Sequence, residues 1–259
     1  MYNILVTGSI HEIGLEMLRK EKDIKIHFAP DLPLAEILKI IAPFHCILTR
    51  SETPVPKELI DKAPKLKVIA RAAVGIGNID VDYATEKGIL VINTPGKNTN
   101  SAAELTIGLL LSAMRKIIPA HIHMSKLKWD RHTFTGTELL GKTIGIIGLG
   151  NVGHRVARYA KAFEMEVIAY DPYIADEVFE RHHARKCTWD ELISTSDVIT
   201  LHVPKTEETT GMIGAKEFSR MKSGVVILNS ARGGVIQEKS LLEELKSGKV
   251  AAAGIDTWE

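Results

Sequence analysis

The sequence predicts an α/β protein of two domains, each a doubly wound parallel sheet. Short β-branched runs alternate with helical patterns along the whole chain, which is typical of this class. The 259 residues exceed the length of one average domain. A turn-forming segment, Asn93 to Asn98, interrupts the alternation. We therefore expect a first domain over residues 1–95 and a second over residues 96–259.

The first domain is predicted to hold five short strands separated by helices. The helices are expected to begin near Glu12, Leu34, Pro56 and Val81, where polar or proline positions precede apolar runs. The predicted strands are Ile4–Thr7, Lys25–Phe28, Cys46–Thr49, Lys67–Ala70 and Ile89–Ile92.

The second domain is predicted to open with one long helix, Ser101–Met124, that bridges the two domains. Its apolar face carries Ala103, Ile107, Leu110 and Leu111 at helical spacing. The alternation then resumes, with strands predicted at Ile144–Ile147, Glu166–Tyr170, Val198–His202, Val225–Leu228 and Ala251–Ile255.

The composition narrows the classes of partner. A formal net charge of +1 provides no broad basic surface for nucleic acid. The longest apolar stretch, Leu105–Met114, is too short to span a membrane. Cys46 and Cys187 lie far apart among apolar residues, which indicates buried thiols in a cytoplasmic, reducing compartment. No His, Cys or carboxylate grouping has the spacing of a metal site, so no metal is expected.

A glycine-rich turn follows the buried run Ile144–Ile147 and predicts a dinucleotide site. Gly148 and Gly150 allow a tight turn and close backbone approach, and Gly153 lets the next helix pack on the strand. The amides at the start of that helix then face a pyrophosphate. Asp171 ends the next strand, where a carboxylate accepts both ribose hydroxyls and repels a ribose phosphate. The pattern therefore favours NAD over NADP.

Arg232 stands just past a predicted strand, within Leu228–Gly234. A guanidinium there can grip a carboxylate with two donors. The alternative is an ordinary surface arginine, and the ligand-binding edge of the sheet favours the functional interpretation.

These features resemble the D-isomer-specific 2-hydroxy acid dehydrogenase family, and within it the phosphoglycerate dehydrogenases, across essentially the whole chain. The matching stretches are Arg50–Ser51, Arg71–Asp80, Asn93–Pro95, Ser101–Glu104, Trp129–Leu139, Gly148–Gly153, Tyr170–Pro172, Leu201–Pro204, Asn229–Gly234 and Gly254–Asp256. The resemblance implies a flavodoxin-like substrate domain and an NAD-binding Rossmann domain.

The resemblance also implies roles for individual residues. Arg232 would be the catalytic arginine that orients a 2-oxo acid. The implied cofactor contacts are Val74, Gly148, Gly150, Asn151, Val152, Gly153, Asp171, His202, Val203, Pro204, Thr209, Ser230, Ala231, Arg232 and Asp256. The implied substrate contacts are Arg50, Arg71, Val74, Gly75, Asn98 and Arg131, of which the three arginines would surround a phosphate.

The expected reaction is NAD-dependent oxidation of D-3-phosphoglycerate to 3-phosphohydroxypyruvate, the entry to serine synthesis, by a homodimer in which Trp129–Leu139 reaches a neighbour. Two alternatives stay open. One is a glyoxylate or hydroxypyruvate reductase, and the other is a non-catalytic protein that senses NAD(H) on the same fold.

The acid–base residues of the family, a glutamate and a histidine, would follow Glu259. The last strand of the second sheet and the helix that returns to the first domain would follow it too. We therefore expect this chain to be part of a longer enzyme. His202 resembles a residue beside the adenosine end of the cofactor, so we do not expect it to act as the base.

Overall fold

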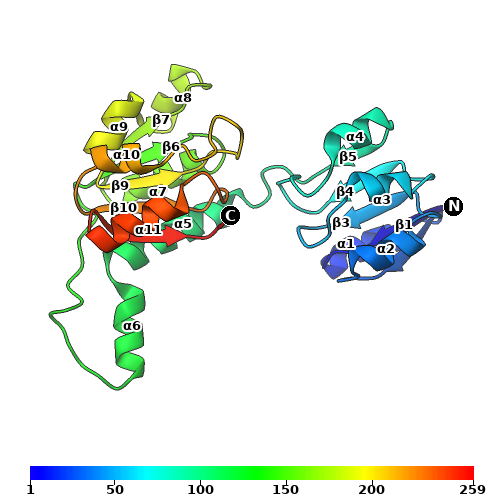
Figure 1. The fold of residues 1–259 in the computed structure, drawn as a ribbon, viewed down its shortest axis with the longest axis horizontal. Coiled ribbons are helices and arrows are strands. Elements are labelled where there is room, and N and C mark those ends of the chain that lie inside the picture. The colour runs from blue at the N-terminus through cyan, green and yellow to red at the C-terminus, as the bar shows by residue number, and fades with distance from the viewer. The chain divides into compact units, whose positions relative to one another are not determined.

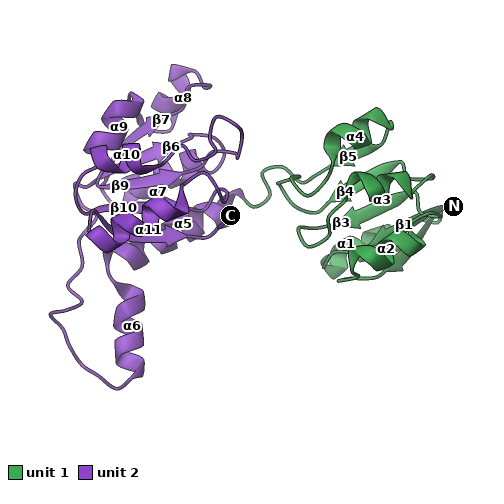
Figure 2. Cartoon of the chain, viewed as in Figure 1, with its two compact units in different colours: residues 1–98 green, residues 99–259 purple.

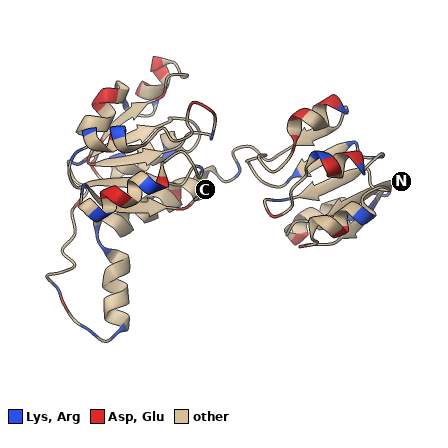
Figure 3. Ribbon diagram, viewed as in Figure 1, with Lys and Arg blue, Asp and Glu red and all other residues tan.

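The computed structural model describes residues 1–259. The chain forms two compact units, Met1–Asn98 and Thr99–Glu259 (Figure 2). The division falls three residues beyond the boundary expected between residues 95 and 96. Basic and acidic residues are interspersed along the ribbon of each unit, in keeping with the small net charge (Figure 3).

The first unit is a five-stranded parallel sheet with helices between its strands (Figure 1). The strand order β2-β1-β3-β4-β5 is that of flavodoxin-like sheets and confirms the predicted fold class. Its elements are β1 Tyr2–Val6, α1 Glu12–Arg19, β2 Ile24–Phe28, α2 Leu34–Ile40, β3 Cys46–Thr49, α3 Lys57–Asp61, β4 Val68–Arg71, α4 Val81–Glu86 and β5 Leu90–Ile92.

The second unit is a six-stranded parallel sheet in the order β11-β10-β9-β6-β7-β8, which is the order of dinucleotide-binding sheets. The two-residue strand β8 has no counterpart among the predicted strands. The elements are α5 Thr99–Met114, α6 Ile117–Ser125, β6 Thr143–Ile147, α7 Gly153–Ala162, β7 Glu166–Tyr170, α8 Asp176–Arg181, β8 Arg185–Lys186, α9 Trp189–Thr195, β9 Val198–Leu201, α10 Ala215–Arg220, β10 Val225–Asn229, α11 Glu238–Ser247 and β11 Val250–Ile255.

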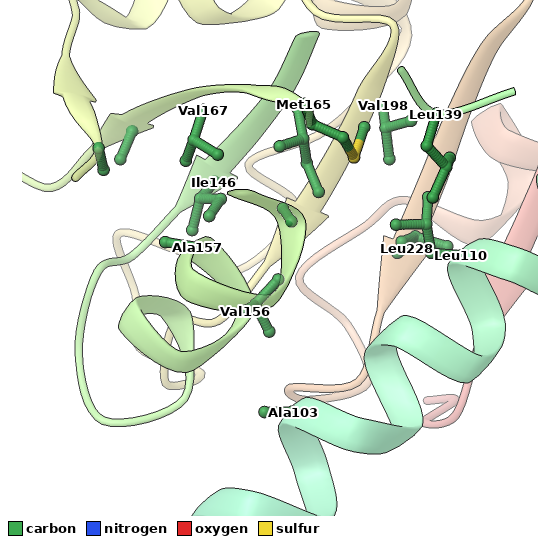
Figure 4. Packing of buried hydrophobic residues seen from close by; sticks show 14 of the residues in the cluster. Ala103, Leu110, Leu139, Ile146, Val156, Ala157, Met165, Val167, Val198 and Leu228 are labelled. Carbon is green, nitrogen blue, oxygen red and sulfur yellow. The ribbon is translucent and has the colours of Figure 1, made fainter. Parts of the chain in front are cut away.

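Helices α5 and α7 share one face of the second sheet (Figure 4). Ala103 and Leu110 of α5 are fully buried there, beside Val156 of α7. Ile107 and Leu111 pack against the same cluster. The apolar face that the sequence predicts for this helix is therefore its packing face, which holds α5 against α7, β10 and β11.

The prediction of one long helix over Ser101–Met124 is wrong. The chain forms α5 and α6, bent by 66° at a break after Met114. Lys116 adopts left-handed backbone angles, with φ 53°. Pro119 has no amide hydrogen, and its ring would clash with the carbonyl of Arg115 in a continuous helix. The proline therefore explains why the helix stops and restarts.

Each helix by itself falls short of the length and apolar character that a membrane span needs, and only the bent pair α5 and α6 together reaches both. Five residues of α5 are buried within the second unit, whereas α6 buries none.

The edge strand β5 leaves Leu90 and Ile92 largely exposed. A further segment covering the first sheet, and a further strand beyond β11, stay predictions. Both cysteines are free, with Cys187 buried and Cys46 half-buried. Burial raises the pKa of each thiol to about 11, so both stay protonated at neutral pH.

Candidate cofactor and substrate site

The glycine turn between β6 and α7 is shaped by two close backbone approaches. Gly148 has φ +88°, and a Cβ there would lie 2.9 Å from the His202 carbonyl oxygen. A Cβ on Gly153 would lie 2.1 Å from the carbonyl oxygen of Gly148. Gly150 differs, because nothing lies within 4 Å of the position its Cβ would take. The space beside Gly150 is therefore open to a ligand.

Asp171 follows β7 and is tied to the glycine turn. Its Oδ2 accepts a hydrogen bond from the Leu149 amide at 3.0 Å, and its Oδ1 accepts one from the Tyr173 amide at 3.0 Å. Asn151 and Val152 continue the turn, and Val152 occupies the N-cap position of α7 without a side-chain hydrogen bond. A hydrogen bond thus joins the predicted ribose-binding carboxylate directly to the predicted phosphate-binding turn.

A cavity of about 280 Å³ lies at the carboxyl ends of β6, β7 and β9, where ligands bind in open α/β sheets. Seven of its lining residues are among the predicted cofactor contacts: Gly148, Gly150, Asp171, His202, Val203, Pro204 and Thr209. The sequence reasoning missed the other seven: Ile147, Tyr170, Pro172, Tyr173, Thr206, Glu208 and Met212. Ile147 directly precedes Gly148, and the other six lie within three residues of Asp171 or Thr209, so nearness in sequence was the available signal.

His202 is unsuited to proton transfer. Its Nε2 lies 3.0 Å from the Thr200 hydroxyl. Although part of the residue reaches the cavity, desolvation of the ring lowers its pKa to about 4. The imidazole is therefore neutral at physiological pH and acts as a packing group in the cavity wall.

The loop after β10 carries Ser230, Ala231 and Arg232 and is folded around the side chain of Asn229. Asn229 is buried, accepts from the Ala231 amide at 3.0 Å and donates to the Arg232 carbonyl at 2.8 Å. The amide of Asp256, after β11, donates to the Asn229 carbonyl at 2.9 Å. The guanidinium of Arg232 donates to the Ala231 carbonyl at 2.6 Å, and the residue is exposed. Its remaining donors are available to an anion.

Two of the predicted substrate arginines lie at the carboxyl ends of neighbouring strands in the first unit. Arg50 follows β3 and donates to the Ser9 carbonyl at 3.2 Å. Arg71 ends β4, is buried, and donates to the Ser51 hydroxyl at 3.3 Å. Two cations on adjacent strand ends suit an anionic group.

Glu52 lies beside both arginines, and its Oε1 accepts from the Ser9 amide at 3.2 Å. Its own backbone amide, that of Ser9, and the charges of Arg50 and Arg71 together lower the pKa of its carboxyl group. An ionised carboxylate therefore offsets part of the positive charge at this edge.

The other predicted substrate residues are more widely spread along the chain. The carbonyl of Val74 accepts from the Asn93 side chain at 2.7 Å, which fixes the loop that also carries Gly75. Asn98 is the last residue of the first unit, and Arg131 is exposed on a loop of the second. That these residues join Arg50 and Arg71 in one site stays a prediction. No three His, Cys, Asp or Glu side chains are grouped to hold a metal ion.

The fold and the turn define a dinucleotide-binding α/β protein. The open space at Gly150 and the placed carboxylate of Asp171 fit NAD. The chain belongs to the D-isomer specific 2-hydroxyacid dehydrogenase family, because the model of that family's NAD-binding domain matches residues 107–259.

Sequence similarity to known proteins extends over the first unit as well. The chain is 44% identical over 256 residues to a D-3-phosphoglycerate dehydrogenase of Archaeoglobus fulgidus, covering 99% of this chain and 48% of that protein. It is 42% identical to a hydroxypyruvate reductase of Thermotoga maritima, covering 100% of this chain and 83% of that protein. The chain thus spans about half the length of the phosphoglycerate dehydrogenase that it matches.

A solved structure with a similar fold is D-lactate dehydrogenase from Aquifex aeolicus, complexed with NAD and lactic acid. It has 32% sequence identity and a TM-score of 0.86, over 99% of this chain and 77% of that one. The family match and this complex support the expectation of NAD as the cofactor.

Proposed function

We propose that the protein is an NAD-dependent dehydrogenase that oxidises the 2-hydroxy acid D-3-phosphoglycerate to 3-phosphohydroxypyruvate. The observation that carries the proposal is the bond between Asp171 and the glycine turn, at the edge of the sheet that also carries Arg232. NAD, when bound, accepts a hydride from the hydroxyl-bearing carbon.

In this proposal the chain's residues bind and orient the reactants. The turn around Gly150 and the carboxylate of Asp171 hold the cofactor, and Arg232 grips the substrate carboxylate and carbonyl oxygen. His202 takes no proton, because its pKa lies near 4. The hydroxyl proton is moved by the glutamate and histidine that the family resemblance implies.

Arg50 and Arg71 support a phosphorylated substrate, with Arg131 as a third expected contact. The name of the Archaeoglobus fulgidus relative supports the same choice. The name of the Thermotoga maritima relative supports hydroxypyruvate reduction, the second candidate. The two candidates differ in whether the arginines of the first unit matter for activity.

The test is to follow NADH absorbance with the full natural protein and D-3-phosphoglycerate, hydroxypyruvate or glyoxylate. Arg232→Ala should lower kcat/KM about 100-fold or more, since it removes a charged donor from the reacting group. Arg220→Ala is the matched control, because Arg220 is a surface arginine ion-paired with Asp190 at 2.8 Å. Tight NADH binding without turnover of any 2-hydroxy acid would instead support the NAD-sensing alternative.

We also propose that the protein is a homodimer in the cytoplasm. Apolar side chains gather on α6 and the segment after it, at Ile117, Ile118, Ile122, Met124, Leu127 and Trp129, all of them exposed. Exposed apolar side chains gathered along one segment are typical of a protein interface. A second copy of the chain is the partner that the family resemblance implies.

A further inference from the structure

The mouth of the cavity carries a hydrogen bond that the predicted site does not include. Tyr173 donates from its phenol to Oε2 of Glu208, and both residues line the cavity with Asp171. The backbone amide of Tyr173 also donates a hydrogen bond to Oδ1 of Asp171. One tyrosine therefore ties together two carboxylates, one after β7 and one in the loop after β9.

The loop that bears Glu208 is held in place by its own threonines. The Thr206 amide donates to the Thr209 hydroxyl at 2.8 Å, and the Thr209 amide donates to the Thr206 hydroxyl at 3.2 Å. The Thr209 hydroxyl in turn donates to the Pro204 carbonyl at 2.6 Å. Glu208 thus stands on a turn that is braced by hydrogen bonds of its neighbours.

The charge around the cavity is one-sided. Its lining contains the carboxylates of Asp171 and Glu208 and no lysine or arginine. Lys205, the cation nearest in sequence, does not line the cavity, and its Nζ lies 3.3 Å from Glu259. No basic side chain of the lining compensates a negative charge brought to this end of the site.

We propose that Glu208, positioned by Tyr173, is a second specificity-determining carboxylate beside Asp171, and that it disfavours cofactors with a phosphate on the adenosine ribose. The inference rests on the proposed function only in that the cavity takes the adenosine end of NAD. A 2′-phosphate there would be repelled by two negative charges, whereas the uncharged 2′-hydroxyl of NAD would not be repelled. The hydrogen bond to Glu208 also raises the pKa of Tyr173, which keeps the phenol protonated and able to donate.

The experiment measures the binding of NADH and NADPH to the full natural protein by nicotinamide fluorescence, without any substrate. Glu208→Gln should tighten NADPH binding relative to NADH by about three- to tenfold, and added salt should reduce the difference from wild type. Glu207→Gln is the matched control, since it removes the same charge one residue away, from a side chain outside the cavity lining. Its ratio should stay at the wild-type value.

Tyr173→Phe tests the positioning role. It should shift the NADPH to NADH ratio in the same direction as Glu208→Gln but by less. The double variant should shift the ratio no further than Glu208→Gln alone, because the tyrosine acts through the carboxylate.

Equal ratios in Glu208→Gln and Glu207→Gln would overturn the inference, and so would a shift that salt does not reduce. The failure of the proposed reaction gives a different result. A protein that binds NADH but oxidises no 2-hydroxy acid would contradict the reaction while leaving the ratio measurement intact.

Discussion

The hydroxyl oxygens of Thr106 and Ser230 lie 2.7 Å apart, although 124 positions separate them in the sequence. The Thr106 hydroxyl donates to the Ala102 carbonyl at 2.8 Å, so Ser230 is the donor in the shared bond. Thr106 is fully buried on α5, and Ser230 belongs to the loop that presents Arg232. The packed helix therefore fixes the loop expected to meet cofactor and substrate.

Removing this bond should cost stability and loosen the loop. Thr106→Val keeps the side-chain shape and leaves Ser230 without its acceptor, so we expect a loss of about 1 kcal/mol in unfolding free energy and weaker NADH binding. Urea unfolding of Thr106→Val, Ser230→Ala and the double variant gives the coupling between them. Strictly additive losses would show that the two hydroxyls do not stabilise one another.

Alanine substitutions at Gly150 and Gly153 should have different effects, the first on cofactor binding and the second on stability. Gly153→Ala places a Cβ 2.1 Å from a backbone oxygen, so about 1–3 kcal/mol of stability should be lost. Gly150→Ala meets no atom within 4 Å, so its Tm should equal that of the wild type. The added methyl group occupies the space expected for the pyrophosphate, so NADH affinity should fall about tenfold or more. Unchanged NADH binding in Gly150→Ala would remove the basis for the dinucleotide site.

His202 should make the second unit less stable in acid. Its pKa falls from 6.5 to about 4 on folding, so the unfolded chain binds the proton more readily. The stability that depends on the neutral ring is complete above pH 6.5 and is lost as the pH falls toward 4, by up to about 3 kcal/mol. Thermal melts of His202→Gln should show a smaller loss between neutral pH and about pH 5 than the wild type. Parallel curves for the two proteins would contradict this assignment.

Substitutions of Arg50 and Glu52 should change KM for a phosphorylated substrate in opposite directions. Arg50→Ala should raise KM for D-3-phosphoglycerate about tenfold and leave KM for glyoxylate nearly unchanged, since only the first substrate carries a phosphate. Glu52→Gln keeps an acceptor for the Ser9 amide but removes the negative charge beside the arginines. It should therefore lower KM for phosphoglycerate. Steady-state kinetics with both substrates provide the check, and equal effects on both would exclude phosphate recognition at Arg50.

The apolar surface of α6 should govern the oligomeric state. Ile122 is 48% exposed, and Ile122→Glu places a charge in the proposed interface. Light scattering after gel filtration should show a monomer for this variant and a dimer for the wild type. Ile13→Glu is the control, because Ile13 is also exposed but lies on α1 of the first unit. A wild-type protein that is monomeric at micromolar concentration would contradict the proposed dimer.

Local sequence patterns predicted the helix–strand alternation closely, because buried parallel strands require apolar runs of fixed length. Gly148, Gly150, Gly153 and Asp171 were recognisable for a similar reason, since their spacing reflects one continuous strand, turn and helix. The interrupted helix at Lys116 was missed because its apolar periodicity continues across the break. Pro119 was the available sign, and it outweighs the periodicity.

The sequence by itself determined the fold class, the glycine turn and the arginine after β10, because each depends on residues that are close together in the chain. Only the tertiary structure brought Thr106 to Ser230 and Tyr173 to Glu208. Those pairs depend on the spatial order of the strands in the sheet, which places loops from distant positions in the sequence at one edge. The physical reason is that hydrogen bonds and charges act over a few ångströms of space, whatever number of residues lies between the partners.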